Sequence, residues 1–214
     1  MGRYQMSAAL ILALAGCEQA VLGDGEVIDD IRMLQSFNGV ATWGAIPAEI
    51  RVGMPQRVVI RVDQNLSSRI HAEVVDGVLS VYGDFGVELE PTELSLVVEM
   101  ERLSSIETRG WGGMVVNDVQ ADVLSVSAGG EGTLQMFGVA NTLDLYTAEA
   151  PTVDARRLIA RDVLLDVEGD GLTHVYATHM VDGVVLGDGD VYILGPASDV
   201  RVRQDGNGNI VTID

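Results

Sequence analysis

Short alternations of apolar and polar residues follow one another along the second half of the chain, from about Ile106 to Val211. In segments such as 124–128 and 143–145 every second residue is apolar, which is the pattern of a strand with one buried face. A corner of small residues interrupts the alternation at regular intervals. The corners are Gly110-Trp111-Gly112, Gly130-Glu131-Gly132, Ala148-Glu149-Ala150, Gly169-Asp170-Gly171, Gly187-Asp188-Gly189 and Gly206-Asn207-Gly208.

The corners recur with an almost constant period. Subtracting the numbers of their first residues gives spacings of 20, 18, 21, 18 and 19. A repeat of this length predicts stacked coils, in which each strand pairs with its equivalent one coil away at about 4.8 Å. The predicted fold is therefore all-β: a parallel β-helix-like solenoid with about 19–20 residues per coil over residues 103–214.

Residues 31–102 have strands at irregular spacing instead. β-Branched residues recur in 49–52 and 57–62, 94–100 reads as another strand, and Asp76-Gly77 separates two further apolar runs. Asp-Gly supplies the positive-φ residues of a tight turn, so a hairpin is expected there. We expect an irregular β part that leads into the coils, within one domain covering 31–214. Residues 18–30 are small and acidic with little apolar period, which predicts a flexible acidic tether.

The first seventeen residues combine Arg3 with a nine-residue apolar run. That run is too short for a membrane-spanning helix, which needs about 20 residues, so it indicates a targeting segment. The run Leu14-Ala15-Gly16-Cys17 resembles the lipobox of bacterial lipoproteins. The resemblance implies that 1–17 is a lipoprotein signal peptide and that lipid on Cys17 anchors the protein in a membrane. The alternative is an ordinary secretory signal with an incidental cysteine.

Composition narrows the classes of partner. The chain carries 32 acidic and 13 basic residues, a formal charge of −19, so nucleic acid and anionic lipid headgroups are disfavoured. Because aromatic residues make up only 5% of the chain, the core must consist mainly of small aliphatic side chains. Cys17 is the only cysteine, which excludes an intramolecular disulfide.

The corners also carry the candidate chemistry. If the coils are in register, four corner carboxylates lie on one edge about 5 Å apart; they are Glu131, Glu149, Asp170 and Asp188. One hypothesis is a weak calcium ladder, and the other is a row of polar turn tips. Trp111, between glycines, either protrudes to stack on a sugar or covers the edge of the first coil. The three histidines are too scattered to predict a metal site, and no cofactor is expected.

The order of these features resembles the auto-transporter adhesin "head GIN" family of bacterial envelope proteins. The resemblance covers about residues 31–214 and rests on Phe37-Asn38-Gly39-Val40, on 57–66 and 76–81, and on the Gly-x-Gly corners that end at 206–208. It implies a β-helix-like fold and an adhesin-like role. The family supplies no catalytic residues to carry over.

These observations predict a lipid-anchored envelope protein that binds or scaffolds without catalysis, with a glycan or an envelope protein as ligand. With Glu18 after the cysteine, the resemblance to bacterial lipoproteins implies anchoring in the outer membrane, facing either the periplasm or the exterior. The alternative is a polysaccharide-active β-helix enzyme, a lyase or hydrolase. Its candidate residues on adjacent coils are Arg156, Arg157, Arg161, Asp166 and Asp170. The oligomeric state is left open by the sequence.

Overall fold

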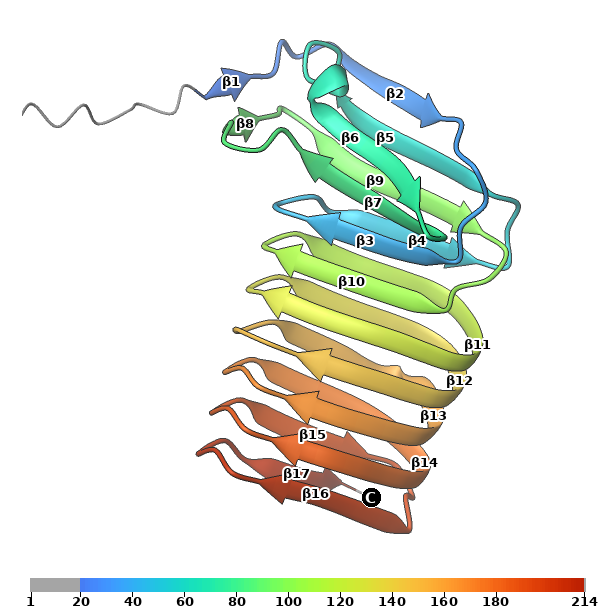
Figure 1. Ribbon diagram of the computed structural model, residues 1–214, viewed down its shortest axis with the longest axis vertical. Coiled ribbons are helices and arrows are strands. Elements are labelled where there is room, and N and C mark those ends of the chain that lie inside the picture. Colours follow the sequence, from blue (N-terminus) through green and yellow to red (C-terminus); the bar gives the residue numbers. More distant parts are fainter. Residues whose placement is uncertain (1–19, 214) are drawn as a thin grey trace, which may run out of the picture.

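The computed structural model describes residues 20–213. Within this range the protein is almost entirely β, with one 3-10 turn, η1 (Ser67–Arg69), and no α-helix. Figure 1 shows a tall stack of strands with sharp corners along one edge and smooth bends along the other. The predicted all-β solenoid is confirmed. No helix in the described range is both long enough and apolar enough to cross a bilayer.

Parallel strands build the coils. Each long strand starts after a corner on one face, follows the bend, and ends at the next corner on the opposite face (Figure 1). The strands of the coils are β10 (Ser105–Gly110), β11 (Gly113–Gly130), β12 (Thr133–Thr147), β13 (Thr152–Val167), β14 (Leu172–Val185), β15 (Asp190–Leu194), β16 (Asp199–Gln204) and β17 (Ile210–Ile213).

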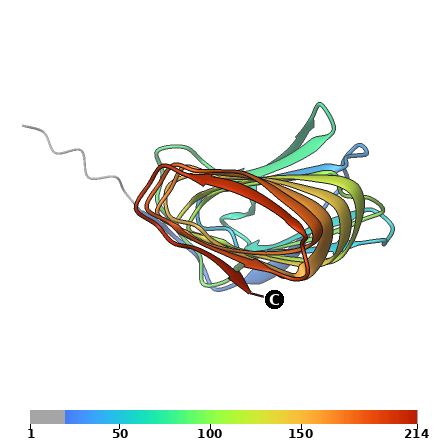
Figure 2. The ribbon, with the colours of Figure 1, turned by 90° about the horizontal axis from the view of Figure 1, so that it is seen from below.

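Two sheets therefore face each other across the core, and Figure 2 shows them end-on as a flattened ring. One sheet contains the first halves of the long strands with β15, β17, β4 (Ala48–Val52) and β9 (Leu94–Met100). The other contains their second halves with β10, β16, β3 (Gly39–Trp43) and β7 (Val78–Gly83). Residue partners confirm the period: Ser105 pairs with Ser125, 20 positions on, and Leu172 pairs with Asp190, 18 positions on.

Aliphatic side chains fill the space between the sheets in rows that run along the stack. One such row is Ile106, Val126, Leu145 and Leu165, which pair in register on successive coils and are all buried. Burial of a Val or Leu side chain is worth roughly 1.5–3 kcal/mol, so the rows hold the coils together.

The corner glycines are required by close stacking. A Cβ on Gly171 would lie 2.0 Å from the carbonyl oxygen of Pro151, and one on Gly169 would lie 1.9 Å from that of Glu149. Neither glycine has a positive φ. In the corner where alanines replace glycines, Glu149 itself takes a φ of 64°. Each corner thus rests directly on the backbone of the corner before it.

The N-terminal part departs from the repeat by using antiparallel pairs. β2 (Val27–Arg32), β5 (Arg57–Asp63) and β9 form one antiparallel group, and β6 (Ile70–Val75) forms a hairpin with β7. Asp76 and Gly77 at its tip have φ values of 50° and 79°, so the predicted hairpin is confirmed.

The prediction of a flexible tether over 18–30 is wrong for the residues from 21 onward. β1 (Val21–Leu22) pairs in parallel with β8 (Leu89–Glu90), and β2 adds six antiparallel pairs with β5. The buried carboxylate of Asp63 fixes this segment: it accepts hydrogen bonds from the Gly25 N–H at 2.8 Å and from the Thr92 N–H and hydroxyl at 2.8 and 2.6 Å. The domain thus starts before residue 31, and the predicted signal peptide, 1–17, lies outside the described residues.

Candidate functional site

The stacked corners form one long edge, which we call the corner edge. Backbone hydrogen bonds join each corner to the one above it: Glu131 N–H to Gly110 O at 3.0 Å, and Ala150 N–H to Gly130 O at 3.0 Å. The middle residue of each corner therefore projects from the same side of the molecule. In order along the edge these residues are Trp111, Glu131, Glu149, Asp170, Asp188 and Asn207.

The first half of this edge borders a groove of about 660 Å³, which we call the acidic groove. Its charged lining consists of Arg109, Glu131, Glu149, Glu168 and Asp170, and Trp111 also lines it. The Glu168 carboxylate accepts a hydrogen bond from the Tyr146 hydroxyl at 2.8 Å, and this bond raises the pKa of Tyr146. Across residues 20–213 neither Glu131 nor Glu149 has a side-chain hydrogen bond or ion pair, so both can accept hydrogen bonds from a ligand.

The last corner carboxylates have structural partners instead. Asp170 accepts a hydrogen bond from the Asp188 N–H at 3.3 Å, and Asp188 accepts two from Asn207, at 3.0 and 2.9 Å. Asn209 donates to Asp190 in the same way, and its side-chain hydrogen bond is the main reason that the pKa of Asp190 lies below its usual value. Asparagine in the final corner thus supplies donors that a further aspartate would lack.

The calcium hypothesis finds no ligand set in the described range. Between residues 20 and 213 no three His, Cys, Asp or Glu side chains lie together in an arrangement that could hold a metal ion. The corner carboxylates form a row along the stack, and a row spreads its oxygens instead of converging them on one point.

Directly above the acidic groove lies a second hollow, of about 690 Å³, which we call the aromatic cleft. Its floor is aliphatic and includes Ile46, Ile70, Leu89 and Leu94. Four aromatic side chains form its walls; they are Trp43, Tyr82, Phe85 and Trp111. Both tryptophans of the chain are therefore in one cleft.

Three of these rings pack on one another. The centroid of Tyr82 lies 5.5 Å from that of Trp43 and 5.2 Å from that of Phe85. His71 stacks on Tyr82 at 5.2 Å, and its Nε2 lies 2.6 Å from Asp84, which also pairs with Arg69 at 2.9 Å. The hydrogen bond with His71 is the main reason that the pKa of Asp84 lies below its usual value. This wall of the cleft is thus rigid before any ligand arrives.

Phe85 and Trp111 remain open to solvent, with 79% and 71% of their surface exposed. The Trp111 N–H donates to Gly44 O at 3.3 Å, which fixes the corner beneath the β3–β4 turn. Of the two alternatives for Trp111, the structure has the protruding one. Because Trp111 lines both hollows, the aromatic cleft and the acidic groove form one continuous surface along the corner edge.

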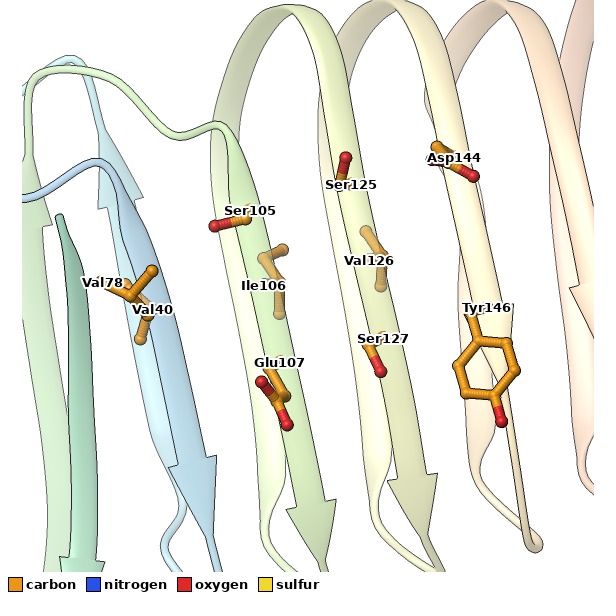
Figure 3. Close-up of a pocket in the computed structure, with 10 residues that line it drawn as sticks. All are labelled: Val40, Val78, Ser105, Ile106, Glu107, Ser125, Val126, Ser127, Asp144 and Tyr146. Atoms are coloured by element: carbon orange, nitrogen blue, oxygen red, sulfur yellow. The ribbon is translucent and has the colours of Figure 1, made fainter. Parts of the chain in front are cut away.

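The outer face of one sheet carries a third, shallower hollow, of about 310 Å³, shown in Figure 3. Small side chains cause it: Ser105, Ser125 and Ser127 stand where larger residues lie elsewhere on the face. Glu107, Asp144 and Tyr146 border it. Figure 3 shows these polar groups spread along three neighbouring strands, without an acid and a base facing a common point.

Of the residues proposed for an enzyme, only Arg156 and Arg157 share a hollow, one of about 480 Å³ that Asp154 also lines. Arg156 pairs with Asp154 at 2.6 Å, and Arg161 pairs with Asp162 at 2.6 Å. Both pairs lie close to the edge where the long strands bend, opposite the corner edge. The guanidinium of Arg157 lies 5.4 Å above the ring of Phe137. Asp170 lies on the opposite, corner edge, and Asp166 lies on an outer face. The structure therefore gives no support to a catalytic pair among them.

Sequence reasoning missed most of the aromatic cleft. It singled out Trp111 because glycines flank it, and the same signal is present at Phe85, which stands in Gly83-Asp84-Phe85-Gly86. Trp43 precedes Gly44. An aromatic residue next to glycine in a turn could have suggested all three.

Comparison with known proteins agrees with this architecture. A family model described as "putative auto-transporter adhesin, head GIN domain" matches residues 36–197. The chain belongs to this family. All four aromatic residues of the cleft lie inside the head GIN match, and the family description supports an adhesin-like, non-catalytic role associated with the cell envelope. No curated protein matches the sequence.

Solved structures share the head GIN fold. A "putative adhesin" from Bacteroides fragilis has a TM-score of 0.74 at 18% identity and covers 91% of this chain and 100% of its own. Two proteins of Parabacteroides distasonis are also similar. One, a "putative lipid binding protein", has a TM-score of 0.57 at 17% identity over 92% of this chain and 100% of its own. The other, a "putative adhesin", has a TM-score of 0.52 at 21% identity and covers 91% of this chain and 100% of its own. At these identities the similarity establishes the fold.

Proposed function

We propose that this head GIN protein is a lipid-anchored, non-catalytic binding protein of the bacterial envelope, and that it holds its ligand on the corner edge. The observation that carries the proposal is the meeting of the aromatic cleft and the acidic groove at Trp111. Exposed aromatic side chains are costly in water unless a partner covers them, and here two of them border one hollow.

The rigidity of the edge supports binding. Backbone hydrogen bonds fix every corner, and the contacts of Asp84 with Arg69 and His71 fix the aromatic wall. A preformed surface loses little conformational entropy when a ligand binds, so affinity is gained without rearrangement. Hydrolysis of a glycosidic bond would need two carboxyl groups that flank the bond. Glu131 and Glu149 project from successive corners of the same edge, so both would lie on one side of a chain that runs along it instead of flanking a bond. Asp84 is held by Arg69 and His71, and Asp170 accepts a hydrogen bond from the next corner.

An array of glycans and envelope proteins tests the binding role. The probe is the mature chain from residue 17 with Cys17→Ser, which keeps every described residue. We expect at least one ligand whose signal falls strongly in Trp111→Ala. Binding that survives both Trp111→Ala and Glu131→Gln would remove the corner edge from the proposal. Incubation of the same chain with polysaccharides should release no new chain ends; turnover would make the protein an enzyme.

The lipid anchor is a separate part of the proposal. It is supported by the sequence around Cys17 and by the position of β1, which starts four residues later and pairs with β8 on the rim of the cleft. Four residues span at most about 14 Å, so lipid on Cys17 would keep the cleft-bearing end of the domain near the membrane. Bacteria that express the full chain should incorporate labelled fatty acid into it, and the Cys17→Ser chain should stay unlabelled. An unlabelled parent chain would exclude the anchor.

A further inference from the structure

We infer that the corner edge binds an uncharged saccharide chain, with one sugar in the aromatic cleft against Trp111 and the following sugars along the acidic groove. This inference rests on the proposed function, because it names the class of ligand for the same edge. It draws on three independent observations: the open aromatic faces, the unpaired carboxylates and the spacing of the coils.

The aromatic cleft offers what a sugar ring needs for stacking. A pyranose has C–H groups on its faces and hydroxyls around its rim, so it pairs an apolar face with polar edges. Phe85 and Trp111 are mostly exposed and lie on turns next to glycines. Phe85 packs on Tyr82, and most of its surface still faces solvent. Covering such rings removes apolar surface from water, which favours binding by about 25 cal/mol per Å². The wall formed by Trp43 and Tyr82 is already packed and would confine the sugar.

The carboxylates around the cleft and the groove are hydrogen-bond acceptors, and sugar hydroxyls can donate to them. Glu88 lines the cleft, and Glu131 and Glu149 line the groove beyond Trp111. Within the described part of the chain the carboxylates of all three lack a hydrogen bond or ion pair. Hydrogen bonds to an ionised carboxylate are about twice as strong as those between neutral groups, so these residues would orient a sugar chain.

The spacing of the corners matches an extended polymer. Successive coils are about 4.8 Å apart, which is close to the length of one sugar unit in an extended chain. A chain that starts at Trp111 therefore meets a new carboxylate at each following corner, first Glu131 and then Glu149. A peptide that binds through a single anchor residue would not contact the carboxylates at successive corners.

Charge and area argue against other classes of ligand. The chain has a net charge of −19, and four carboxylates against one guanidinium, that of Arg109, line the groove, so phosphate groups and acidic sugars are repelled. A bilayer that received Trp111 would have to strip water from neighbouring Glu131, which is unfavourable. A stable protein interface buries about 1,200–2,000 Å², whereas the apolar surface here is confined to one cleft.

Titration with neutral oligosaccharides tests the inference. The probes are β-1,4-linked oligomers of glucose and of N-acetylglucosamine of increasing length, added to the mature chain with Cys17→Ser and followed by tryptophan fluorescence and calorimetry. We expect at least one series to bind with an affinity that rises with length until the groove is filled. Trp111→Ala should weaken binding at least about tenfold, as removal of a central aromatic contact does. The double change of Glu131 and Glu149 to Gln should weaken only the longer oligomers.

Phe137→Ala is the matched control, since Phe137 is an aromatic residue that lines neither the aromatic cleft nor the acidic groove and packs against Arg157 in a separate hollow. It should leave the affinity unchanged. Absence of binding in both series, or binding that ignores Trp111→Ala, would overturn the saccharide inference. Binding of the same chain to zwitterionic phosphatidylcholine vesicles that requires Trp111 would also overturn it, in favour of a membrane surface. An array hit on an envelope protein that requires Trp111 would reject the saccharide and leave the proposed function standing.

Discussion

The N-terminal part, residues 20–103, and the coils, residues 104–213, solve the same packing problem in different ways. The coils repeat one unit, and every strand pair within them is parallel. The N-terminal part mixes parallel and antiparallel pairs, and it contributes three of the four aromatic side chains of the cleft. The comparison teaches that the repeat supplies a rigid, evenly spaced edge, whereas departures from the repeat supply the specialised surface.

The two parts are also held together by different forces. In the coils the backbone of one corner lies against the next, and glycine is needed for contact. In the N-terminal part single polar side chains fix loops, as Asp63 does for Gly25 and Thr92. Each kind of contact predicts a different response to substitution.

The largest effect is expected from a Cβ inserted between corners. Gly171→Ala places an atom 2.0 Å from Pro151 O, so the stack must shift, and we expect a loss of about 3 kcal/mol or more in the free energy of unfolding. Gly129→Ala is the control, because its nearest neighbours lie 3.8 Å away and its φ is not positive. Urea unfolding compares the two. Equal stability of both variants would mean that the corners are not in direct contact.

A core truncation in each part tests whether they unfold together. Leu143 in the coils and Leu96 in the N-terminal part are both buried, and each change to Ala should cost about 2–5 kcal/mol. Because β3 and β4 pair directly with β10 and β11, we expect one shared transition. Circular dichroism reports the strands of both parts, and the fluorescence of Trp43 and Trp111 reports the junction between them. Separate midpoints by the two probes would show that the parts are independent.

Asp63→Asn should cause a smaller loss that depends on pH. The hydrogen bond from the Thr92 side chain is the main reason that the pKa of Asp63 is lowered, so the ionised form is favoured in the folded state. A depressed folded pKa adds stability above the unfolded value of about 3.9, and this stability is lost as the pH falls through the folded pKa. The parent chain should therefore melt several degrees above Asp63→Asn at neutral pH, and the two melting curves should approach each other below about pH 4. A difference that persists unchanged in acid would contradict this account.

The smallest effect on stability is expected at the binding surface. Trp111→Ala removes a side chain that is 71% exposed, so the free energy of unfolding should change by less than about 0.5 kcal/mol. Thermal melting checks this, and the same variant then serves in the binding assays. A large loss would mean that Trp111 supports the first coil, as one of the alternatives from the sequence had it.

The coils could be predicted from the sequence because their signal is local and repeated. The spacing of the corners, the alternation around Leu124 and Leu143 and the glycines themselves all point to one arrangement. The sequence did not predict the strand β2, because Asp29 and Asp30 interrupt its apolar residues. Its partner is the strand β5, in which Asp63 pairs with Val27 more than thirty residues away. Antiparallel pairing of such distant segments has no periodic signature.

The aromatic cleft could not be predicted for a related reason. Its residues come from turns near positions 43, 85 and 111, and only the pairing of β3 with β7 and β10 brings them together. The acidic groove was foreseeable, since Glu131 and Glu149 belong to the repeat. Asp170 and Asp188 accept hydrogen bonds from the following corners and so stabilise the stack. Glu131 and Glu149 accept none in the described part of the chain, and this difference could not be read from the repeat.

The pairing of β1 with β8 has a mechanical consequence. Suppose that lipid on Cys17 is fixed in the membrane and that a surface-bound ligand is held by Phe85 and Trp111. A force that pulls the two apart would then pass from the cleft through β8 and β1 to the membrane. The six residue pairs between β2 and β5 would resist it next. The coils beyond the first would carry none of this force, so a pull on the anchored protein would not separate their strands.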